Sequence, residues 1–459
     1  MNQSWDVIIV GARCAGASLA VHLARAGVKT LLLEASPRGT NMPMSTHLIQ
    51  PPGVESLVRM GLGDVVRTAP EATRFRFSLD DVVMISTFDR GGGARCVRRS
   101  TIDPALQNLA ENAGADFRDR HRVKALLKDG GRVTGVVATT PRGEETFTAN
   151  LVVGADGVNS TVAKLTGVEE YLTAEASRGG YYLYFPAPAK WENDWDAALE
   201  HLGDDVRYVF RADGDLVVLV ATMPLEDMRT WGKDWRARLL SKLAESPVTG
   251  PLSSGKEPVG KGCGLLDAHY FYRRPVGPGF ALVGDAGHFK DYVTGMGMTD
   301  AFLDAERLAS AIFDGRDEAF AHYWRDRDVA TLPLHYDAVQ QGTVGFNNPL
   351  MRWVIDHVAR RPELKERVAR VLARELAPDQ MVPMSAMLPW MGEALLRGRF
   401  DVIKGFFAMG KQQSTEKREL ETRRALLRES SEALARAPKR ERGQGGADYS
   451  AAARAALIA

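Results

Sequence analysis

The sequence has little of what defines several large classes of protein. Its 459 residues include three cysteines, Cys14, Cys96 and Cys263, which have no metal-ligand spacing and form no even disulfide set. The 59 lysines and arginines nearly balance the 58 aspartates and glutamates, so neither nucleic acid nor an acidic membrane is an expected partner. No stretch approaches the roughly 18 apolar residues of a membrane span. We therefore expect no metal site and no membrane span, and the N-terminus, which lacks a signal pattern, predicts a cytoplasmic location.

The sequence does contain, near its start, a strand, a glycine turn, a helix and a second strand that ends in an acid. Residues 7–10 are apolar and β-branched, and a Gly-x-x-x-x-Gly turn follows them. The strand at 29–33 ends at Glu34, about 20 residues beyond the turn. Such spacing is typical of dinucleotide sites, where backbone N–H groups bind the pyrophosphate and the acid accepts hydrogen bonds from the adenosine ribose. We predict a dinucleotide site formed by Gly11, Ala12, Arg13, Ala15, Gly16 and Glu34.

Arg13 departs from the usual Gly-x-Gly-x-x-Gly pattern, which has its middle glycine at this position. An arginine must turn its side chain aside or place its guanidinium against the phosphates, which its charge favours. The sequence leaves both arrangements open. A glycine-bearing βαβ unit that binds no nucleotide is the alternative, and the acid at the end of the second strand argues against it.

Two further apolar strands end in an acid beside glycine. Residues 151–153 lead into Asp156 and Gly157, and residues 280–283 lead into Gly284 and Asp285. Parallel sheets hold their ligands at the carboxyl ends of their strands, so the acids at 34, 156 and 285 are expected to converge on one cofactor. A helix is also predicted after residue 103, with Asp103 as N-cap and Pro104 at its first position. This boundary would place Arg99 at a strand end near the ligand.

The order of predicted elements indicates an α/β fold: a Rossmann-like domain, an antiparallel β-sheet substrate domain and a helical C-terminal region. We assign residues 1–175 to the first part of the nucleotide domain, with a substrate-side excursion near 70–95. Residues 176–272 form the antiparallel domain, residues 273–345 return to the first domain, and residues 346–459 are the helical region. The charged, glycine-rich segment 439–450 is expected to be mobile.

These motifs resemble those of the FAD-dependent aromatic hydroxylases, the group A flavoprotein monooxygenases of the p-hydroxybenzoate hydroxylase fold, which are related to the flavin-dependent halogenases. The resemblance covers residues 5 to about 330. It implies that the first glycine turn and Glu34 bind the ADP half of FAD, that Arg99 reaches the pyrophosphate and ribityl region, and that Asp285 holds the ribityl chain. It also implies FAD and NAD(P)H contacts for Asp156 and Gly157. Backbone N–H groups at Gly295, Gly297 and Met298 are expected to face the flavin's pyrimidine edge and stabilise its negative charge when reduced.

The resemblance implies a monooxygenase that uses NAD(P)H and O2, with a flavin C4a-hydroperoxide as the oxygen donor. Its substrate is expected to be a small, hydrophobic molecule, aromatic or polyketide-like. NAD(P)H is expected to bind only transiently, because no second dinucleotide fingerprint follows a strand. The choice between NADH and NADPH and the oligomeric state stay open.

Three other functions stay open. The first is a flavin-dependent halogenase, although the Trp-x-Trp-x-Ile-Pro motif of that family is missing and the closest pairs, Trp191/Trp195 and Trp231/Trp235, have the wrong spacing. The second is a flavin-linked reductase of prenyl chains, whose N-terminal turn is similar. The third is a flavin-binding protein without turnover.

Catalytic side chains are less well defined than cofactor contacts, and three are candidates: Tyr292, His288 and His47. Tyr292 stands where the hydroxylases usually have proline, and its phenol either faces the substrate or only frees the turn. His288 is expected to be a structural member of the Gly-Asp turn before an acid-base catalyst. His47 is expected at the surface or in packing, in a loop that the resemblance places near the flavin. Cys14 lies beside a helix N-terminus, which favours a lowered thiol pKa.

Overall fold

The computed structural model describes residues 4–436, apart from 41, 43–44, 46 and 89–91, so the segment 439–450 lies outside the described residues. A parallel sheet forms the centre of the first domain, in the strand order β19-β20-β11-β1-β2-β8, with β10 and β9 added beyond the first half of β11. Its strands are β1 (Ser4–Val10), β2 (Thr30–Leu33), β8 (Asp116–Arg118), β9 (Arg122–Asp129), β10 (Arg132–Thr140), β11 (Gly143–Gly154), β19 (Val276–Gly277) and β20 (Phe280–Leu282).

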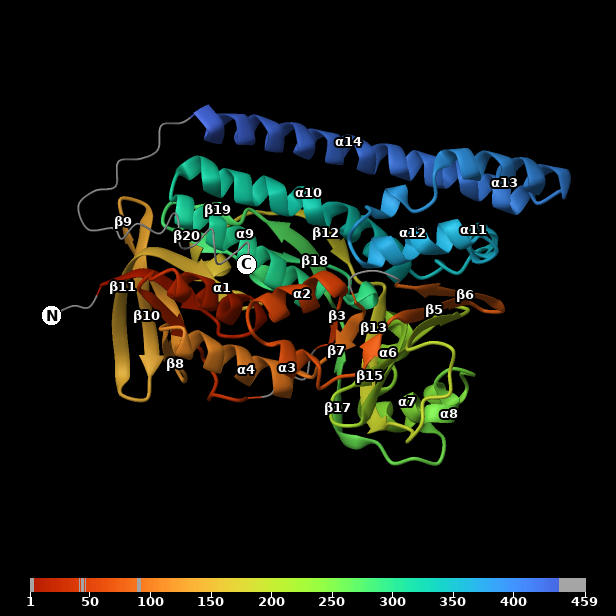
Figure 1. The fold of residues 1–459 in the computed structure, drawn as a ribbon, viewed down its shortest axis with the longest axis horizontal. Helices are drawn as coiled ribbons and strands as arrows, with labels where there is room; N and C mark the ends of the chain where they lie inside the picture. Colours follow the sequence, from red (N-terminus) through yellow and green to blue (C-terminus); the bar gives the residue numbers. More distant parts are fainter. Residues whose placement is uncertain (1–3, 41, 43–44, 46, 89–91, 437–459) are drawn as a thin grey trace.

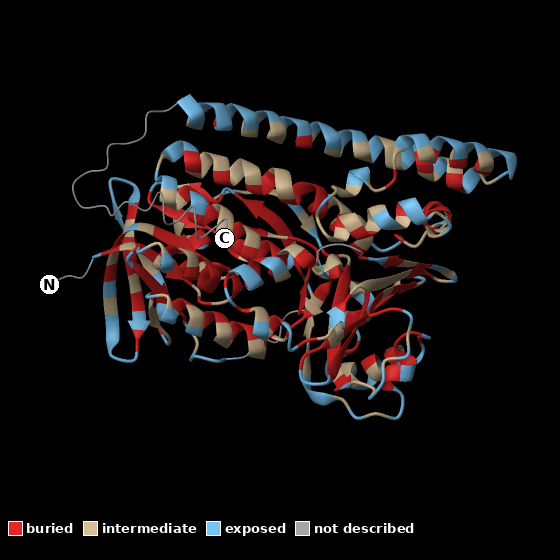
Figure 2. Cartoon of the chain, viewed as in Figure 1, coloured by how far each residue is buried: buried red, intermediate tan, exposed pale blue. Residues whose placement is uncertain are grey.

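Strand β1 is apolar on both sides because both faces of this sheet are covered. Val7 and Ile9 pack toward the helices α1, α4 and α9, whereas Ile8 and Val10 pack toward the sheet extension and α5. Figure 1 shows how these elements are arranged, and the strands of the sheet are largely coloured as buried in Figure 2. The helices of this domain are α1 (Cys14–Arg25), α2 (Pro51–Arg59), α3 (Gly63–Val66), α4 (Arg99–Asn112), α5 (Thr161–Thr166) and α9 (Gly297–Asp314).

A second, mostly antiparallel sheet lies beside the first domain, in the strand order β17-β13-β16-β15-β14-β5-β6 with β3, β4 and β7 joined to it. Helices α6–α8 cover one of its faces (Figure 1). Its strands are β3 (Leu48–Ile49), β4 (Glu71–Ala72), β5 (Arg74–Leu79), β6 (Val82–Thr87), β7 (Ala94–Cys96), β13 (Arg178–Pro186), β14 (Ala197–Leu202), β15 (Asp205–Ala212), β16 (Leu216–Pro224) and β17 (Val259–Leu265). The covering helices are α6 (Leu225–Arg229), η1 (Gly232–Asp234), α7 (Trp235–Ala244) and α8 (Gly250–Ser253).

The C-terminal helices form a layer along the upper side of both sheets in Figure 1, where the long helix α14 lies over α10. A three-stranded sheet links the two domains beneath α10. The helices are α10 (Asp317–Gly342), α11 (Pro349–Ala359), α12 (Pro362–Leu372), η4 (Pro378–Gln380), α13 (Met384–Leu396) and α14 (Phe400–Arg436), and the strands are β12 (Glu170–Glu175), β18 (His269–Arg273) and β21 (His288–Phe289). Within the described part of the chain, no helix has the length and apolar character needed to cross a bilayer.

The predicted fold class is confirmed, but the predicted start of one helix is wrong. Helix α4 begins at Arg99, so Pro104 lies inside it and Asp103 is no N-cap. The Asp103 carboxylate instead accepts a hydrogen bond of 2.8 Å from Nε of Arg99, one helical turn earlier. This ion pair extends the helix backwards by a turn and holds the arginine at the helix N-terminus, not at a strand end.

Candidate functional site

The first glycine turn is shaped by close backbone approach. A Cβ on Gly11, whose φ is +101°, would lie 2.4 Å from the carbonyl oxygen of Ala155, and a Cβ on Gly16 would lie 1.8 Å from the carbonyl oxygen of Gly11. Both positions therefore require glycine, which lets the end of β1 and the start of α1 pack against the end of β11. The resulting cradle at the N-terminus of α1 is the arrangement that binds a pyrophosphate.

Glu34 and Arg13 lie on either side of this turn. The buried Glu34 carboxylate accepts hydrogen bonds from the backbone N–H groups of Ala12 at 3.0 Å and Ser36 at 2.9 Å. A carboxylate has about four acceptor sites, so it retains capacity for ribose hydroxyls. Arg13 is the N-cap of α1, and its Nη1 is buried with no hydrogen-bond partner in the described part of the chain. A cationic donor left unpaired at a helix N-terminus fits a phosphate ligand.

Asp156 and Gly157 follow β11 at the same edge of the sheet. The Asp156 carboxylate accepts hydrogen bonds from the Ser160 hydroxyl and from the backbone N–H groups of Thr161 and Val162. It therefore caps helix α5, while Gly157 takes the left-handed φ of +78° that the turn requires. The structure thus uses this acid to fix the turn.

The Gly284-Asp285 turn packs directly on the first glycine turn. A Cβ on Gly284 would lie 2.9 Å from the Cβ of Ala15, so glycine brings the two turns together. Asp285 accepts no hydrogen bond from the residues that the structure describes, and burial raises its pKa to about 6 against the opposing charges of Lys290 and Arg99. An unpaired carboxylate at the strand edge beside the cradle fits an acceptor for the hydroxyls of a ribityl chain.

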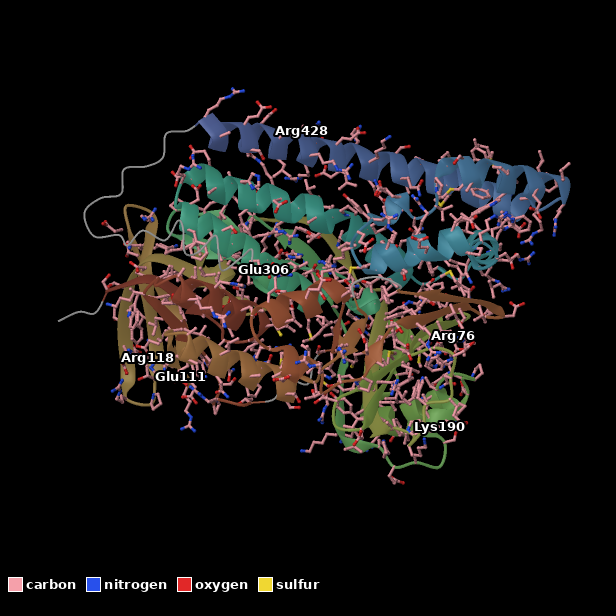
Figure 3. All side chains as sticks on the ribbon, in the orientation of Figure 1. Arg76, Glu111, Arg118, Lys190, Glu306 and Arg428 are labelled. Carbon is pink, nitrogen blue, oxygen red and sulfur yellow. The ribbon has the colours of Figure 1, made fainter. Side chains whose placement is uncertain are left out.

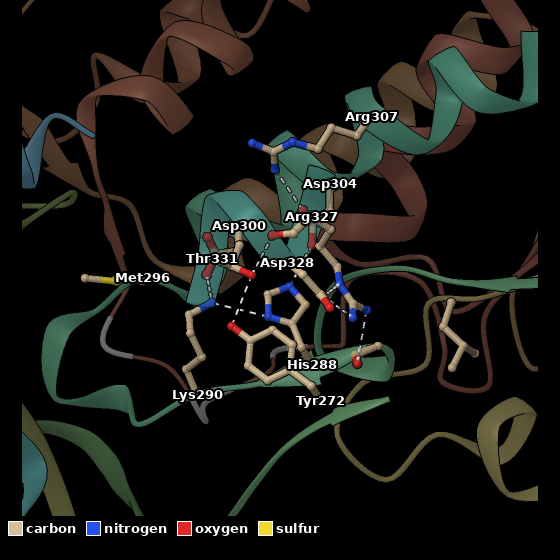
Figure 4. Close-up of polar contacts among 12 residues, drawn as sticks. Tyr272, His288, Lys290, Met296, Asp300, Asp304, Arg307, Arg327, Asp328 and Thr331 are labelled. Atoms are coloured by element: carbon tan, nitrogen blue, oxygen red, sulfur yellow. Dashed lines mark hydrogen bonds and ion pairs between the residues drawn. The ribbon is translucent and has the colours of Figure 1, made fainter. Parts of the chain in front are cut away.

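Behind this turn lies a buried network of charges that Figure 4 shows in close-up. His288 donates from Nε2 to the Asp304 carboxylate at 2.7 Å, and its Nδ1 lies 3.3 Å from the ammonium group of Lys290. Lys290 in turn pairs with Asp300, and Arg307 pairs with Asp304 at 2.9 Å. Burial, and then the charge of Lys290, lower the pKa of His288, so its ring is neutral. Both ring nitrogens are engaged, which supports the structural role over acid-base catalysis.

Arg374 joins the C-terminal region to this network, and no sequence motif pointed to this residue. It pairs with Asp300, donates from Nε to the Gln50 side chain at 2.8 Å, and approaches the carbonyl oxygen of Met296 at 3.4 Å. Residue 374 lies in the segment between α12 and η4, far from any motif. Its contact with Met296 fixes the loop in which Gly295, Gly297 and Met298 lie.

Tyr292 lies at the start of this loop, in the 3₁₀ turn η3 (Tyr292–Thr294) that follows the η2 turn (Gly284–Ala286). Its hydroxyl is 3.4 Å from the carbonyl oxygen of Arg178 and would lie 3.1 Å from a Cβ on Gly180, both on β13. The phenol therefore points at the antiparallel sheet. Gly295 takes a left-handed φ of +62°, and Gly297 and the buried Met298 begin α9, whose N-terminus is thereby presented at the loop.

His47 takes the packing position of its two predicted alternatives, whereas Cys14 differs from the prediction. His47 is fully buried, not at the surface: it contacts the Tyr184 hydroxyl through Nε2, and its Nδ1 has no partner. Burial lowers the pKa of His47 to about 3, so the ring is neutral. Burial likewise raises the pKa of the Cys14 thiol to about 12, the opposite of the expected direction, because desolvation outweighs the helix N-terminus. Cys14 is therefore no reactive thiolate.

A cavity of about 240 Å³ lies between the second sheet and the C-terminal helices. The register pairs Phe75 with Ser86 and Phe77 with Met84, so these four side chains share one sheet face and form the cavity floor. Helices α10, α11, α12 and α14 supply the other walls. Val293, Thr294 and Met296 line the same cavity, so it opens onto the loop behind the Gly-Asp turn.

Comparison with known proteins agrees with this geometry. Residues 4–238, half of the chain, match the family described as FAD binding domain. The chain belongs to this family. The prediction of FAD as the cofactor of an oxidoreductase is therefore confirmed, and the glycine cradle, Arg13 Nη1 and Asp285 are the features that fit it.

Three relatives are informative. A probable electron transfer flavoprotein-quinone oxidoreductase, YgcN of Escherichia coli, is 30% identical over 62% of this chain and 70% of its own length. Digeranylgeranylglycerophospholipid reductase 2 of Methanococcoides burtonii is 26% identical over 76% of this chain and 84% of its own. The 12-dehydrotetracycline 5-monooxygenase/anhydrotetracycline 6-monooxygenase of Streptomyces rimosus is 36% identical over 36% of this chain, but only 33% of its own length is matched.

Solved structures share the fold at low identity. The p-nitrophenol 4-monooxygenase PnpA of Pseudomonas putida has a TM-score of 0.72 and 18% identity, over 82% of this chain and 98% of its own. The flavin-dependent brominase Bmp2 has a TM-score of 0.68 and 16% identity, over 86% and 100%. The resemblance to the FAD-dependent hydroxylases and their halogenase relatives is thus confirmed for the fold, and membership of the FAD binding domain family is confirmed by the match over residues 4–238.

Proposed function

We propose that the protein is an NAD(P)H- and O2-dependent monooxygenase that hydroxylates a small hydrophobic molecule, aromatic or polyketide-like. The cavity carries this proposal, because its largely apolar walls meet the loop Val293–Met296 behind the turn that fits the ribityl chain. A cavity of this kind is typical of sites for small apolar ligands. The partial match to a tetracycline monooxygenase of Streptomyces rimosus supports the same reaction class.

The residues of the chain divide the work of such a reaction. Bound FAD supplies electron transfer from NAD(P)H and the activation of O2. Glu34, Arg13 and Asp285 are proposed to hold its adenosine, pyrophosphate and ribityl parts. The N-terminus of α9 and the N–H groups of Gly297 and Met298 favour negative charge at the loop. The cofactor-binding side chains and N–H groups are proposed to be positioned by Arg99, Asp156, Gly157, Gly295 and the first glycine turn.

The cavity contributes by orienting the substrate and excluding water. The apolar floor formed by Phe75, Phe77 and Met84 offers no general base. The neutral His47 and the protonated Tyr184 lie at the junction between β13 and the cofactor side, and burial raises the pKa of that phenol. Because neither residue lines the cavity, we propose that this pair holds the His47 loop against β13 and that Tyr292 acts as a spacer against the same strand.

The test uses the purified full-length protein. We expect a yellow protein with about one non-covalently bound FAD, and NADH or NADPH oxidation that a subset of aromatic and polyketide-like compounds stimulates. The product formed under ¹⁸O2 should carry one ¹⁸O atom. A folded, colourless protein that takes up no FAD, or a product without ¹⁸O, contradicts the proposal.

A prenyl-chain reductase is the second candidate, because the reductase of Methanococcoides burtonii aligns with 76% of this chain. Its signature is saturation of a double bond with no oxygen in the product. Halogenation is less well supported: Trp195 and Trp231 are buried on the sheet face opposite the cavity, where Trp231 stacks on Tyr181. Complete inertness of the flavin toward NADPH in stopped-flow mixing would indicate a binding protein without turnover.

A further inference from the structure

The cavity carries an excess of negative charge that the protein itself does not neutralise. Three carboxylates line it: Asp337 on α10, Asp379 in η4 and Glu416 on α14. Among the described residues, none of the three forms an ion pair; Asp337 accepts a hydrogen bond from Gln341 at 2.9 Å and Glu416 accepts one from Gln412 at 2.8 Å. The complete ionisable lining comprises these three acids with Arg76, Tyr208, Tyr336 and Lys417.

The two cations in that lining are turned to other partners. Arg76 lies on β5, in the second sheet (Figure 3), and its side chain alternates away from those of Phe75 and Phe77. It contacts Ser78 at 2.7 Å and Glu200 at 3.8 Å. Lys417 is exposed and lies 3.9 Å from Glu421, one turn further along α14. The acids therefore face an apolar space without a counter-charge.

Asp337 lies in the wall, whereas Asp379 is exposed at the rim. Burial raises the pKa of Asp337 to about 6, and the nearby charge of Glu416 acts in the same direction. At neutral pH the carboxylate is thus ionised in an unfavourable environment, which a bound cation would relieve.

Unpaired hydroxyl groups in the same cavity point independently to a ligand. Ser86 is 2% exposed, and its Oγ has no hydrogen-bond partner among the residues that the structure describes. It shares the cavity-facing side of the sheet with Phe75. The Oγ1 of Thr294, in the loop near the cofactor turn, is also buried without a partner. Polar atoms in this state are costly unless a ligand or water satisfies them.

Building on the proposed function, we infer that the substrate is a hydrophobic amine whose protonated nitrogen lies between Asp337 and Glu416 while its apolar body covers Phe75, Phe77 and Met84. Asp337 and Glu416 lie on α10 and α14, and Thr294 and Met296 of the cofactor loop line the same cavity.

The test compares two probes of matched shape, 9-(aminomethyl)anthracene and 9-(hydroxymethyl)anthracene, binding to the FAD-loaded full-length protein. Titration calorimetry at pH 7.5 measures both affinities without requiring turnover. We expect the amine to bind about tenfold more tightly, because it adds a charge-assisted contact to carboxylates. Asp337→Asn and Glu416→Gln should each reduce this preference toward one while the affinity for the alcohol stays unchanged.

Glu432→Gln is the matched control, because it removes the same charge from α14 at an exposed pair with Arg436. It should leave the preference intact. Equal affinities of the two probes, no binding of either, or a preference that Asp337→Asn does not alter would overturn the inference. Failure of the proposed function would look different: the protein would bind amines selectively, but no amine tested under ¹⁸O2 would give a product that contains ¹⁸O.

Discussion

Two regions flank the loop formed by residues 292–296: a buried network behind the cofactor turn, in which the acids form ion pairs, and the cavity, in which, among the described residues, they do not. Behind the cofactor turn, Asp300 and Asp304 each have two partners, and the ring of His288 lies between Asp304 and Lys290 (Figure 4). In the cavity, Asp337 has only an amide donor. Paired buried charges hold a loop rigidly, whereas an unpaired one creates affinity for something else. The first region is therefore structural and the second is suited to recognition.

The largest effect is expected from removing the charge of Asp300, which tests whether the buried ion pairs behind the cofactor turn stabilise the fold. Asp300→Asn leaves Lys290 and Arg374 as buried cations without their counter-charge, so we expect a loss of about 3–5 kcal/mol in the free energy of unfolding. Denaturant unfolding of the FAD-loaded protein measures it. The exposed pair Arg399–Asp401 provides the control, since Asp401→Asn should leave stability unchanged. Equal stability of the two variants would refute the structural role.

A second experiment tests the edge of the cofactor region. Glu34→Lys removes the acceptor of the Ala12 and Ser36 N–H groups and places a cation where ribose hydroxyls are expected. We expect the FAD dissociation constant to rise on the order of tenfold to a hundredfold. Fluorescence titration of the apoprotein with FAD measures this change. Glu416→Gln, in the cavity, should not alter it, and unchanged FAD affinity in Glu34→Lys would mean that the fingerprint was misread.

The pH dependence of FAD affinity tests whether Asp285, on the cofactor side, binds FAD as a carboxylate. Asp285 must be ionised to accept most strongly, and its pKa is about 6, so FAD binding should weaken about tenfold from pH 7 to pH 5. For the apoprotein the sign is reversed: the folded carboxyl binds a proton more tightly than the unfolded one, so protonation stabilises the fold as the pH falls through 6. Asp285→Asn should flatten the FAD profile even though Asp291 titrates in the same range. If the FAD affinity of Asp285→Asn depends on pH as in the unmodified protein, another group causes the pH dependence.

The smallest effect is expected at Tyr292, which borders both regions. Its hydroxyl makes one long contact of 3.4 Å with β13 and is absent from the cavity lining. Tyr292→Phe should therefore keep FAD content, flavin reduction rate and product yield per NAD(P)H within about twofold of the parent. Loss of coupling at normal FAD content would restore a catalytic role for the phenol.

Short-range patterns were sufficient to predict much of the cofactor side. The apolar strands before Glu34, Asp156 and Asp285 and the glycines at 11 and 16 depend on local rules of strand pairing and turn geometry. The start of α4 shows the limit of these rules. An acid before proline usually is a helix N-cap, but Asp103 pairs with Arg99 and lies inside the helix. The expected lowering of the Cys14 pKa failed for a similar reason, since burial is not visible locally.

The sequence by itself thus determined the fold class, the FAD family and the turns that meet at the carboxyl edge of the parallel sheet. Only the tertiary structure decided that Arg374, from the C-terminal region, reaches the carbonyl of Met296. It also decided that Asp337 and Glu416 line one cavity and form no ion pair among the described residues. Each of these contacts joins segments about 80 residues apart. In the sequence, the surroundings of Arg374, Asp337 and Glu416 are typical of ordinary solvated surface. Chain folding, not local pattern, brings such side chains together, because burial and counter-charge depend on the elements packed around them.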